Sequence, residues 1–269
     1  MSLRGRLIVE PGSRVRLSHH DPGDTAGFTD KSDVEKRLAK NVQRLEKLQY
    51  LLYAENRRAL LVVLQGMDAS GKDGVIRHVM TGLNPQGCVV TSFKAPTVEE
   101  LDHDYLWRIH RAVPPRGDIG IFNRSHYEDV LGVRVRGLVP RPVWKKRYEQ
   151  INAFEKGLVQ NDVVILKFML HISKEEQRRR LQERIDDPRK HWKVSPSDFE
   201  DRRHWEEYRK AYEAVLEKCS TAWAPWFVIP SDRKWFRNLA VSQVIVDTLK
   251  SLDMKLPKPA CDVSKLRLD

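Results

Sequence analysis

The chain has 269 residues, of which 41% are hydrophobic and 32% are charged, a balance typical of a globular protein with a sizeable core. Its 48 lysines and arginines exceed its 37 acidic residues by 11, so we expect an anionic ligand such as nucleic acid, a membrane surface or a phosphate polymer. Charge alone does not choose among these ligands. Three cysteines without a C-x-x-C pair argue against a disulfide framework or a thiolate zinc site. The cysteines fit a reducing cytoplasm and the apolar runs are too short to cross a bilayer, so we expect a cytoplasmic protein and no membrane partner.

The first two predicted elements are an arm and a helix. Residues 1–29 show no clear period, and we expect an extended arm packed on the domain or on a neighbouring subunit. A helix is predicted from Asp30 to about Asn56, with a capping-box pattern at Ser32 and Glu35 and an apolar stripe along one face.

Strands and helices then alternate along the rest of the chain. Apolar runs predict five strands, at residues 59–65, 88–93, 118–122, 162–172 and 226–230. Helical patterns between and after them cover residues 97–112, 142–159, 173–185, 197–218 and 235–252. This alternation predicts a three-layer α/β/α fold in one domain over residues 1–269, with a mostly parallel five-stranded sheet and a loosely ordered tail at 254–269.

A glycine-rich turn, G-M-D-A-S-G-K-D at residues 66–73, joins the first strand to a short helical pattern. In that context the turn predicts a phosphate-binding loop, because backbone N–H groups and a helix N-terminus converge on an anion. Lys72 can reach the phosphate that is transferred. The residues predicted to bind phosphate here are Gly66, Ala69, Ser70, Gly71, Lys72 and Asp73. The simpler alternative is a strand-turn-helix unit without a ligand.

Two carboxylates in the same loop predict a metal. Asp73 occupies the position where a standard loop has Ser or Thr, and Asp68 lies inside the loop. Both would repel a polyanion unless metal ions lie between them, so we expect Asp68 and Asp73 to bind Mg²⁺ together with phosphate.

A second polar cluster, F-N-R-S-H-Y-E-D at residues 122–129, follows the third predicted strand. Its Arg124 matches the geometry of phosphate oxygens and is predicted to neutralise charge on the transferring phosphoryl group. Glu128 can accept a hydrogen bond from the exocyclic amine of a base. We therefore predict a nucleotide site at Asn123, Arg124, Tyr127 and Glu128. The alternative is a polar loop held by local ion pairs.

Two further basic segments have different interpretations. Residues 184–200 are predicted to form a lid over the phosphates, with Arg184, Lys190 and Lys193 as its contacts. The neighbouring run 178–180 is expected to fan out into solvent or to pair with nearby acids. Residues 134–147 hold six lysines and arginines and no acid, which fits either a track for a long anion or a solvated face. The chain has no recognisable nucleic-acid module, so no specific nucleic-acid partner is expected.

Together the motifs resemble the polyphosphate kinase 2 family, phosphate-loop kinases of thymidylate-kinase-like fold. The resemblance spans residues 30 to 255 and rests on G-M-D-A-S-G-K-D, F-N-R-S-H-Y-E-D-V, K-H-W-K-V-S-P-S-D and A-P-W-F-V-I-P-S-D-R-K-W. It implies reversible phosphoryl transfer between inorganic polyphosphate and a nucleotide, with Mg²⁺, or Mn²⁺ in its place. It also implies a homodimer or homotetramer.

The same resemblance implies roles for individual residues. Asp68 would hold metal and Lys72 and Asp73 would complete the loop site, whereas Arg124 would be the charge clamp. Arg184, Lys190 and Lys193 would contact phosphates from the lid. The motif with Glu128 resembles the branch that accepts both AMP and ADP (class III), because the ADP-only branch tends to have Asn there.

Two other functions stay open on the sequence alone. An ATP-dependent nucleoside monophosphate kinase would have the same fold, although Asp73 and the excess positive charge argue against it. A non-catalytic protein that binds nucleic acid or another polyanion would show strongly salt-dependent binding and no phosphoryl transfer.

Overall fold

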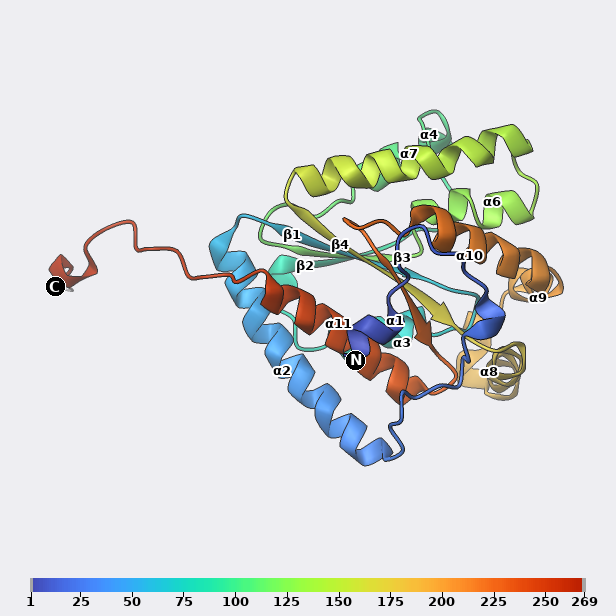
Figure 1. Cartoon of the computed structure of the whole chain (residues 1–269), viewed down its shortest axis with the longest axis horizontal. Coiled ribbons are helices and arrows are strands. Elements are labelled where there is room, and N and C mark those ends of the chain that lie inside the picture. Colours follow the sequence, from blue (N-terminus) through green and yellow to red (C-terminus); the bar gives the residue numbers. More distant parts are fainter. Residues whose placement is uncertain (1, 268–269) are drawn as a thin grey trace.

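The computed structural model describes residues 2–267, and Figure 1 shows one twisted sheet with helices on both sides. The strands lie in the order β2-β3-β1-β4-β5, and every neighbouring pair is parallel. The strand bounds are β1 (Ala59–Gln65), β2 (Cys88–Ser92), β3 (Ile119–Asn123), β4 (Val163–His171) and β5 (Trp226–Pro230). The predicted mostly parallel five-stranded α/β fold is therefore confirmed.

The central strands are apolar along their whole length because helices cover both faces of the sheet. All seven residues of β1 are buried. Leu60, Val62 and Leu64 face one core, whereas Leu61 and Val63 face the other, as the alternation of side chains in a strand requires.

The helices divide between these two faces. Residues of α2, α3 and α11 pack in one core, and residues of α7 and α10 pack in the other; Figure 1 shows α7 and α2 on opposite sides of the sheet. The longer helices are α2 (Lys31–Glu55), α3 (Lys72–Val79), α7 (Arg141–Gln160), α8 (Lys174–Asp186), α9 (Pro196–Arg203), α10 (Trp205–Cys219) and α11 (Lys234–Ser251). The short ones are α1 (Leu3–Leu7), α4 (Val98–Leu101), α5 (Trp107–His110) and α6 (Gly132–Val135). Short 3₁₀ segments are η1 (Leu17–His19), η2 (Pro85–Gly87), η3 (His126–Asp129), η4 (Pro188–Lys193) and η5 (Val263–Lys265).

Three helix boundaries differ from the sequence prediction. The cap of α2 is Asp30, whose carboxylate accepts from the Ser32 backbone N–H, instead of the predicted Ser32–Glu35 box. The predicted helix 97–112 is interrupted between α4 and α5, where the Asp104 side chain accepts from the Leu106 N–H and so competes with helical bonding. The predicted helix 197–218 is two helices, because the chain leaves helical geometry at His204.

The two ends of the chain behave differently. The N-terminal arm packs on the sheet edge: Ile8 bridges to Phe227 of β5, and the Val9 N–H donates to the Trp226 carbonyl over 2.8 Å. The C-terminal segment after α11 runs away from the body of the molecule in Figure 1. Among the described residues, no helix has the length and apolar character needed to cross a membrane.

The strand order places two loops side by side. In the parallel register Leu64 of β1 pairs with Asn123 of β3, so the phosphate loop and the 122–129 cluster begin at the same edge of the sheet. Because ligands of open α/β sheets bind beyond the carboxyl ends of the strands, this edge is where a site is expected.

Candidate active site

The backbone of the phosphate loop needs glycine at positions 66 and 71. Gly66 has φ +152° and Gly71 has φ +104°, and a Cβ on Gly66 would lie 2.7 Å from the Leu170 carbonyl oxygen. Between them Ala69 holds φ +60°, an unusual value for a residue with a side chain. Such conformations persist where the surrounding structure enforces them, and they gather at functional sites. The loop ends at Gly71, and α3 begins at Lys72.

Lys72 folds back across this loop. Its Nζ donates to the carbonyl oxygens of Gly66, over 2.7 Å, and of Met67, over 3.3 Å. Burial, followed by the neighbouring positive charge of Arg124, lowers the pKa of Lys72 to about 8 despite the acids nearby. The lysine is therefore held at the loop by neutral acceptors and is easier to deprotonate than a surface lysine.

Arg124 meets the loop from the end of β3. Its backbone has φ +63°, and its N–H donates to the Leu64 carbonyl over 3.1 Å. The guanidinium donates to Asp68 Oδ1 and lies 3.7 Å from Glu128 Oε1. Burial disfavours its charge, but Glu128 and Asp68 outweigh burial and raise the pKa of Arg124 above its ordinary value. The sharp backbone turn thus aims a permanent cation at the phosphate loop.

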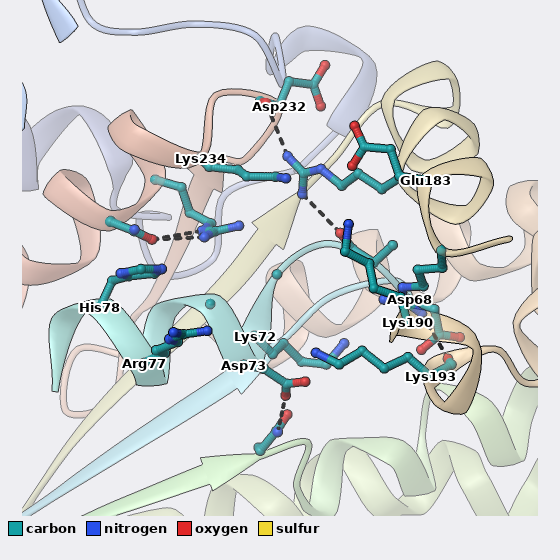
Figure 2. A pocket seen from close by; sticks show the side chains of 18 of the residues that line it. Asp68, Lys72, Asp73, Arg77, His78, Glu183, Lys190, Lys193, Asp232 and Lys234 are labelled. Carbon is teal, nitrogen blue, oxygen red and sulfur yellow. Dashed lines mark hydrogen bonds between the residues drawn. The ribbon is translucent and has the colours of Figure 1, made fainter. Parts of the chain in front are cut away.

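Asn123 and Asp73 form a second bridge between the two loops. The Asn123 Nδ2 donates to Asp73 Oδ1 over 2.8 Å, and both side chains line the same cleft (Figure 2). Asp73 stands in the first turn of α3, where the helix dipole favours a carboxylate. Among residues 2–267 no group of three or more His, Cys, Asp or Glu side chains could hold a metal ion alone.

The predicted lid residues lie on the opposite wall of the cleft. Figure 2 shows Lys190 and Lys193 there, with Lys193 extending toward Lys72. Lys190 pairs with Asp187 over 3.1 Å, and Lys193 lies 4.9 Å from the ring centre of Trp192. This segment is the 3₁₀ turn η4 between α8 and α9, so the basic side chains sit on a short, locally bonded turn.

The lid also contributes an acid that the sequence reading missed. Asp198, at the start of α9, is 8% exposed and accepts from Arg184 Nη1 over 3.1 Å. Burial and then the charge of Asp68 raise the pKa of Asp198 to about 6. The motif K-H-W-K-V-S-P-S-D contains this residue, but nothing in its spacing indicates that it faces Asp68.

The cleft between loop and lid has a volume of about 1200 Å³ and is strongly basic. Its described lining includes thirteen lysines and arginines against six acidic side chains, so it suits a polyanion. Basic and histidine side chains that the sequence did not assign to the site are Lys31, Arg77, His78, Lys94, Arg179, Arg180, Arg233, Lys234 and Arg237. They come from several separate elements, so no single run of charge marks them all.

Comparison with known proteins decides the family. The family model "Polyphosphate kinase 2 (PPK2)" matches residues 28–257. The chain belongs to the polyphosphate kinase 2 family. It is 53% identical over 262 residues to the AMP/ADP-polyphosphate phosphotransferase of Meiothermus ruber, covering 97% of this chain and 98% of the relative. It is 49% identical to the ADP-polyphosphate phosphotransferase of Rhodopseudomonas palustris, with 93% and 91% covered.

A solved structure of this family agrees with the fold. The crystal structure of polyphosphate kinase 2 from Arthrobacter aurescens TC1 superimposes with a TM-score of 0.94 at 44% sequence identity. The match covers 98% of this chain and 94% of that chain. The similarity therefore extends over the whole α/β unit and includes the phosphate loop, the 122–129 cluster and the lid.

One predicted site residue, Tyr127, lies in the core and not in the cleft. Tyr127 is fully buried; its hydroxyl donates to Glu155 Oε1 over 2.8 Å and accepts from Lys167 Nζ over 2.9 Å. The prediction that Tyr127 contacts a nucleotide is corrected accordingly, because no part of its side chain reaches solvent. The 3₁₀ turn η3 directs this ring into the core, whereas Glu128 reaches Arg124.

The basic segment 134–147 does not form a track into the cleft. Arg136 pairs with Asp201 of the lid helix α9, and Arg147 pairs with Asp129. Arg134 donates to the hydroxyl of Tyr148. None of these arginines is among the described residues that line the cleft, so their charge ties helices together.

Proposed function

We propose that this chain transfers phosphoryl groups from inorganic polyphosphate to AMP and to ADP, forming ADP and ATP, and that the reaction is reversible. The observation that carries the proposal is the Arg124–Asp68 pair beside Lys72, at one end of a cleft with a large excess of positive side chains. A phosphate polymer carries about one negative charge per unit, so this lining draws it in and holds it along its length.

The chemistry requires positioning and charge neutralisation more than covalent catalysis. Without a ligand, Lys72 donates to two loop carbonyls. When phosphate binds in the loop, its charged oxygens would take the place of these neutral acceptors. Arg124 stabilises the charge that develops on the transferring group, since its planar fork matches phosphate oxygens. Arg184, Lys190 and Lys193 close the cleft from the lid and exclude water.

Mg²⁺ fits the acidic residues of this site. Magnesium is usually bound by one or two carboxylates together with substrate phosphates, and Asp68 and Asp73 supply two carboxylates in the phosphate loop. When bound, the ion neutralises charge between these carboxylates and the polyanion. Mn²⁺, which also prefers carboxylate and phosphate oxygens, is expected to substitute for it.

The acceptor assignment rests on Glu128 and on the named relatives. The Meiothermus ruber relative is named for AMP and ADP, and the Rhodopseudomonas palustris relative for ADP alone. In this chain Glu128 lies beside Arg124, so it is placed to adjust how the guanidinium meets the acceptor. We assign both AMP and ADP as acceptors, with Asn123 and Arg124 as the nearest candidate contacts.

The test is an assay of the purified protein with Mg²⁺, long-chain polyphosphate and AMP, in which ADP and ATP are followed by chromatography. An ADP-only reaction serves as the control. Formation of both products supports the proposal, and ATP from ADP alone would remove AMP as an acceptor. If product appears only when ATP replaces polyphosphate, the protein is a nucleoside monophosphate kinase. If neither donor yields product while salt-dependent polyanion binding persists, the protein is a binding protein.

A further inference from the structure

Two buried arginines at the edge of the cleft hold the backbone of the phosphate loop. Arg180 of α8 and Arg237 of α11 are 5% and 2% exposed. Arg180 Nη1 donates to the carbonyl oxygens of Ala69, over 2.9 Å, and of Ser70, over 3.1 Å. Arg237 Nη1 donates to the same Ser70 oxygen over 3.1 Å. The prediction that residues 178–180 fan out into solvent or pair with acids is thus incomplete, because Arg180 pairs with Glu176 and also holds the loop.

This arrangement fixes the direction of one peptide group. In a planar trans peptide the carbonyl and the following N–H point in opposite directions. Two guanidinium groups hold the Ser70 carbonyl on the inner side of the loop, so the Gly71 N–H points away from them. That N–H is one of the donors on which a phosphate-binding loop depends.

The charges of the two arginines are balanced differently. Arg180 has a carboxylate partner, since its Nε donates to Glu176 over 2.7 Å. In the described part of the chain Arg237 forms no ion pair; its other acceptor is the neutral Asn238 Oδ1, at 2.9 and 3.1 Å. Burial and then the charge of Arg180 lower the pKa of Arg237 to about 9. A buried charge without a counter-charge is costly, and an anion in the loop would supply one.

Two glycines allow this close approach. A Cβ on Gly71 would lie 1.8 Å from Arg237 Nη1, and one on Gly74 would lie 2.8 Å from its Nη2. The guanidinium therefore packs directly against the loop backbone and the first turn of α3, at the edge of the cleft. Its charge therefore lies next to the loop backbone that an anion would contact.

We propose that Arg237 is a positioning residue for the phosphate chain: it orients the Ser70–Gly71 peptide, and bound phosphate provides its missing counter-charge. The inference rests on the proposed function, since it assumes that the loop binds phosphate. It goes further by assigning part of the affinity for the donor to a buried side chain that acts through the loop backbone.

The test compares Arg237→Gln, which removes the charge but keeps amide donors, with Arg237→Lys, which keeps the charge. Lys250→Met is the matched control, because it removes one positive charge from the exposed end of the same helix. Tripolyphosphate is the probe, and its Kd is measured by calorimetry beside thermal unfolding and the KM values for polyphosphate and AMP. We expect Arg237→Gln to raise the Kd at least about tenfold. The KM for polyphosphate should rise with it, that for AMP should stay near normal, and Arg237→Lys should recover most of the binding.

The outcomes separate three situations. If folded Arg237→Gln binds tripolyphosphate as the wild type does, the inference is overturned, even when its Tm is lower, because the arginine is then only structural. If that variant does not fold, Arg237→Lys decides, and a tenfold loss of affinity in the folded lysine variant would contradict the charge argument. If wild-type protein binds no tripolyphosphate, the proposed function fails first.

Discussion

Arg124 donates a hydrogen bond to Asp68 across 56 residues of sequence, and this contact links the loop after β3 to the loop after β1. The parallel register that pairs Leu64 with Asn123 makes it possible. The pair gives the phosphate loop a carboxylate and a fixed cation at the same point. Removal of the Arg124 cation and removal of the Asp68 carboxylate should therefore have different effects on the reaction.

Replacing Arg124 should affect catalysis far more than stability. Its side chain is 37% exposed, and partly exposed ion pairs contribute little to folding, so Arg124→Met should remain folded with a similar Tm. Loss of a principal electrostatic group should lower kcat by at least about a hundredfold. Steady-state kinetics with polyphosphate and ADP measure the effect, and Arg141→Met, on the exposed first turn of α7, is the control. Near-normal turnover in folded Arg124→Met would exclude the charge-clamp role.

Replacing Asp68 should change the dependence on metal. Asp68→Asn keeps the size of the side chain but removes its charge, so it weakens a metal bound between carboxylate and phosphate. We expect turnover to fall at least about a hundredfold and the Mg²⁺ concentration for half-maximal rate to rise. Titration of Mg²⁺ at fixed polyphosphate tests this, with Asp73→Asn in parallel. An unchanged Mg²⁺ dependence in both variants would show that neither carboxylate binds the ion.

The pH dependence of the reaction rate should show the titration of the Lys72 amine. Burial lowers its pKa to about 8, so the positive charge of the free enzyme is present below that pH and is lost above it. The kcat/KM for polyphosphate, which reports the free enzyme, should fall as pH rises through about 8. Bound phosphate favours the protonated lysine, so the decline in kcat should come at higher pH. Lys72→Arg should remove this limb from whatever activity remains; a limb unchanged in that variant would belong to another group.

Acceptor choice should depend on Glu128. If this carboxylate adjusts how Arg124 meets the acceptor, Glu128→Asn should lower the rate with AMP relative to the rate with ADP. The ratio of kcat/KM values for the two acceptors is the measurement, because it is independent of the amount of active protein. Glu149→Gln, on an exposed turn of α7, is a charge-matched control. An equal loss with both acceptors would mean that Glu128 supports Arg124 without selecting the nucleotide.

Gly74 should tolerate no side chain. Its Cβ would lie 2.8 Å from Arg237 Nη2, and the guanidinium cannot withdraw without giving up its bonds to Ser70 and Asn238. Gly74→Ala should therefore weaken tripolyphosphate binding, although alanine favours a helix by up to about 1 kcal/mol over glycine. Gly157→Ala, inside α7 with open space around it, should be neutral or stabilising. Calorimetric titration and thermal unfolding of both variants test this, and equal behaviour would show that Arg237 yields freely.

The sequence alone was enough to predict the fold class and the main chemistry of the site. Strand runs such as 59–65 and 226–230 were predicted with the observed bounds, because strands buried on both faces are continuously apolar. The phosphate loop was recognisable because its glycines, Lys72 and the flanking strand and helix are all local in sequence. Local patterns therefore determined the architecture, the loop and the family resemblance.

The tertiary structure decided which side chains face the cleft. Tyr127 and Glu128 are neighbours in sequence, but η3 buries the first and brings the second to Arg124. Arg180 and Arg237 come from helices distant in sequence and meet only at the Ser70 carbonyl of the loop. The physical reason is that charge and hydrogen-bonding capacity belong to the residue type, whereas burial and the choice of partner arise from the packing of distant elements.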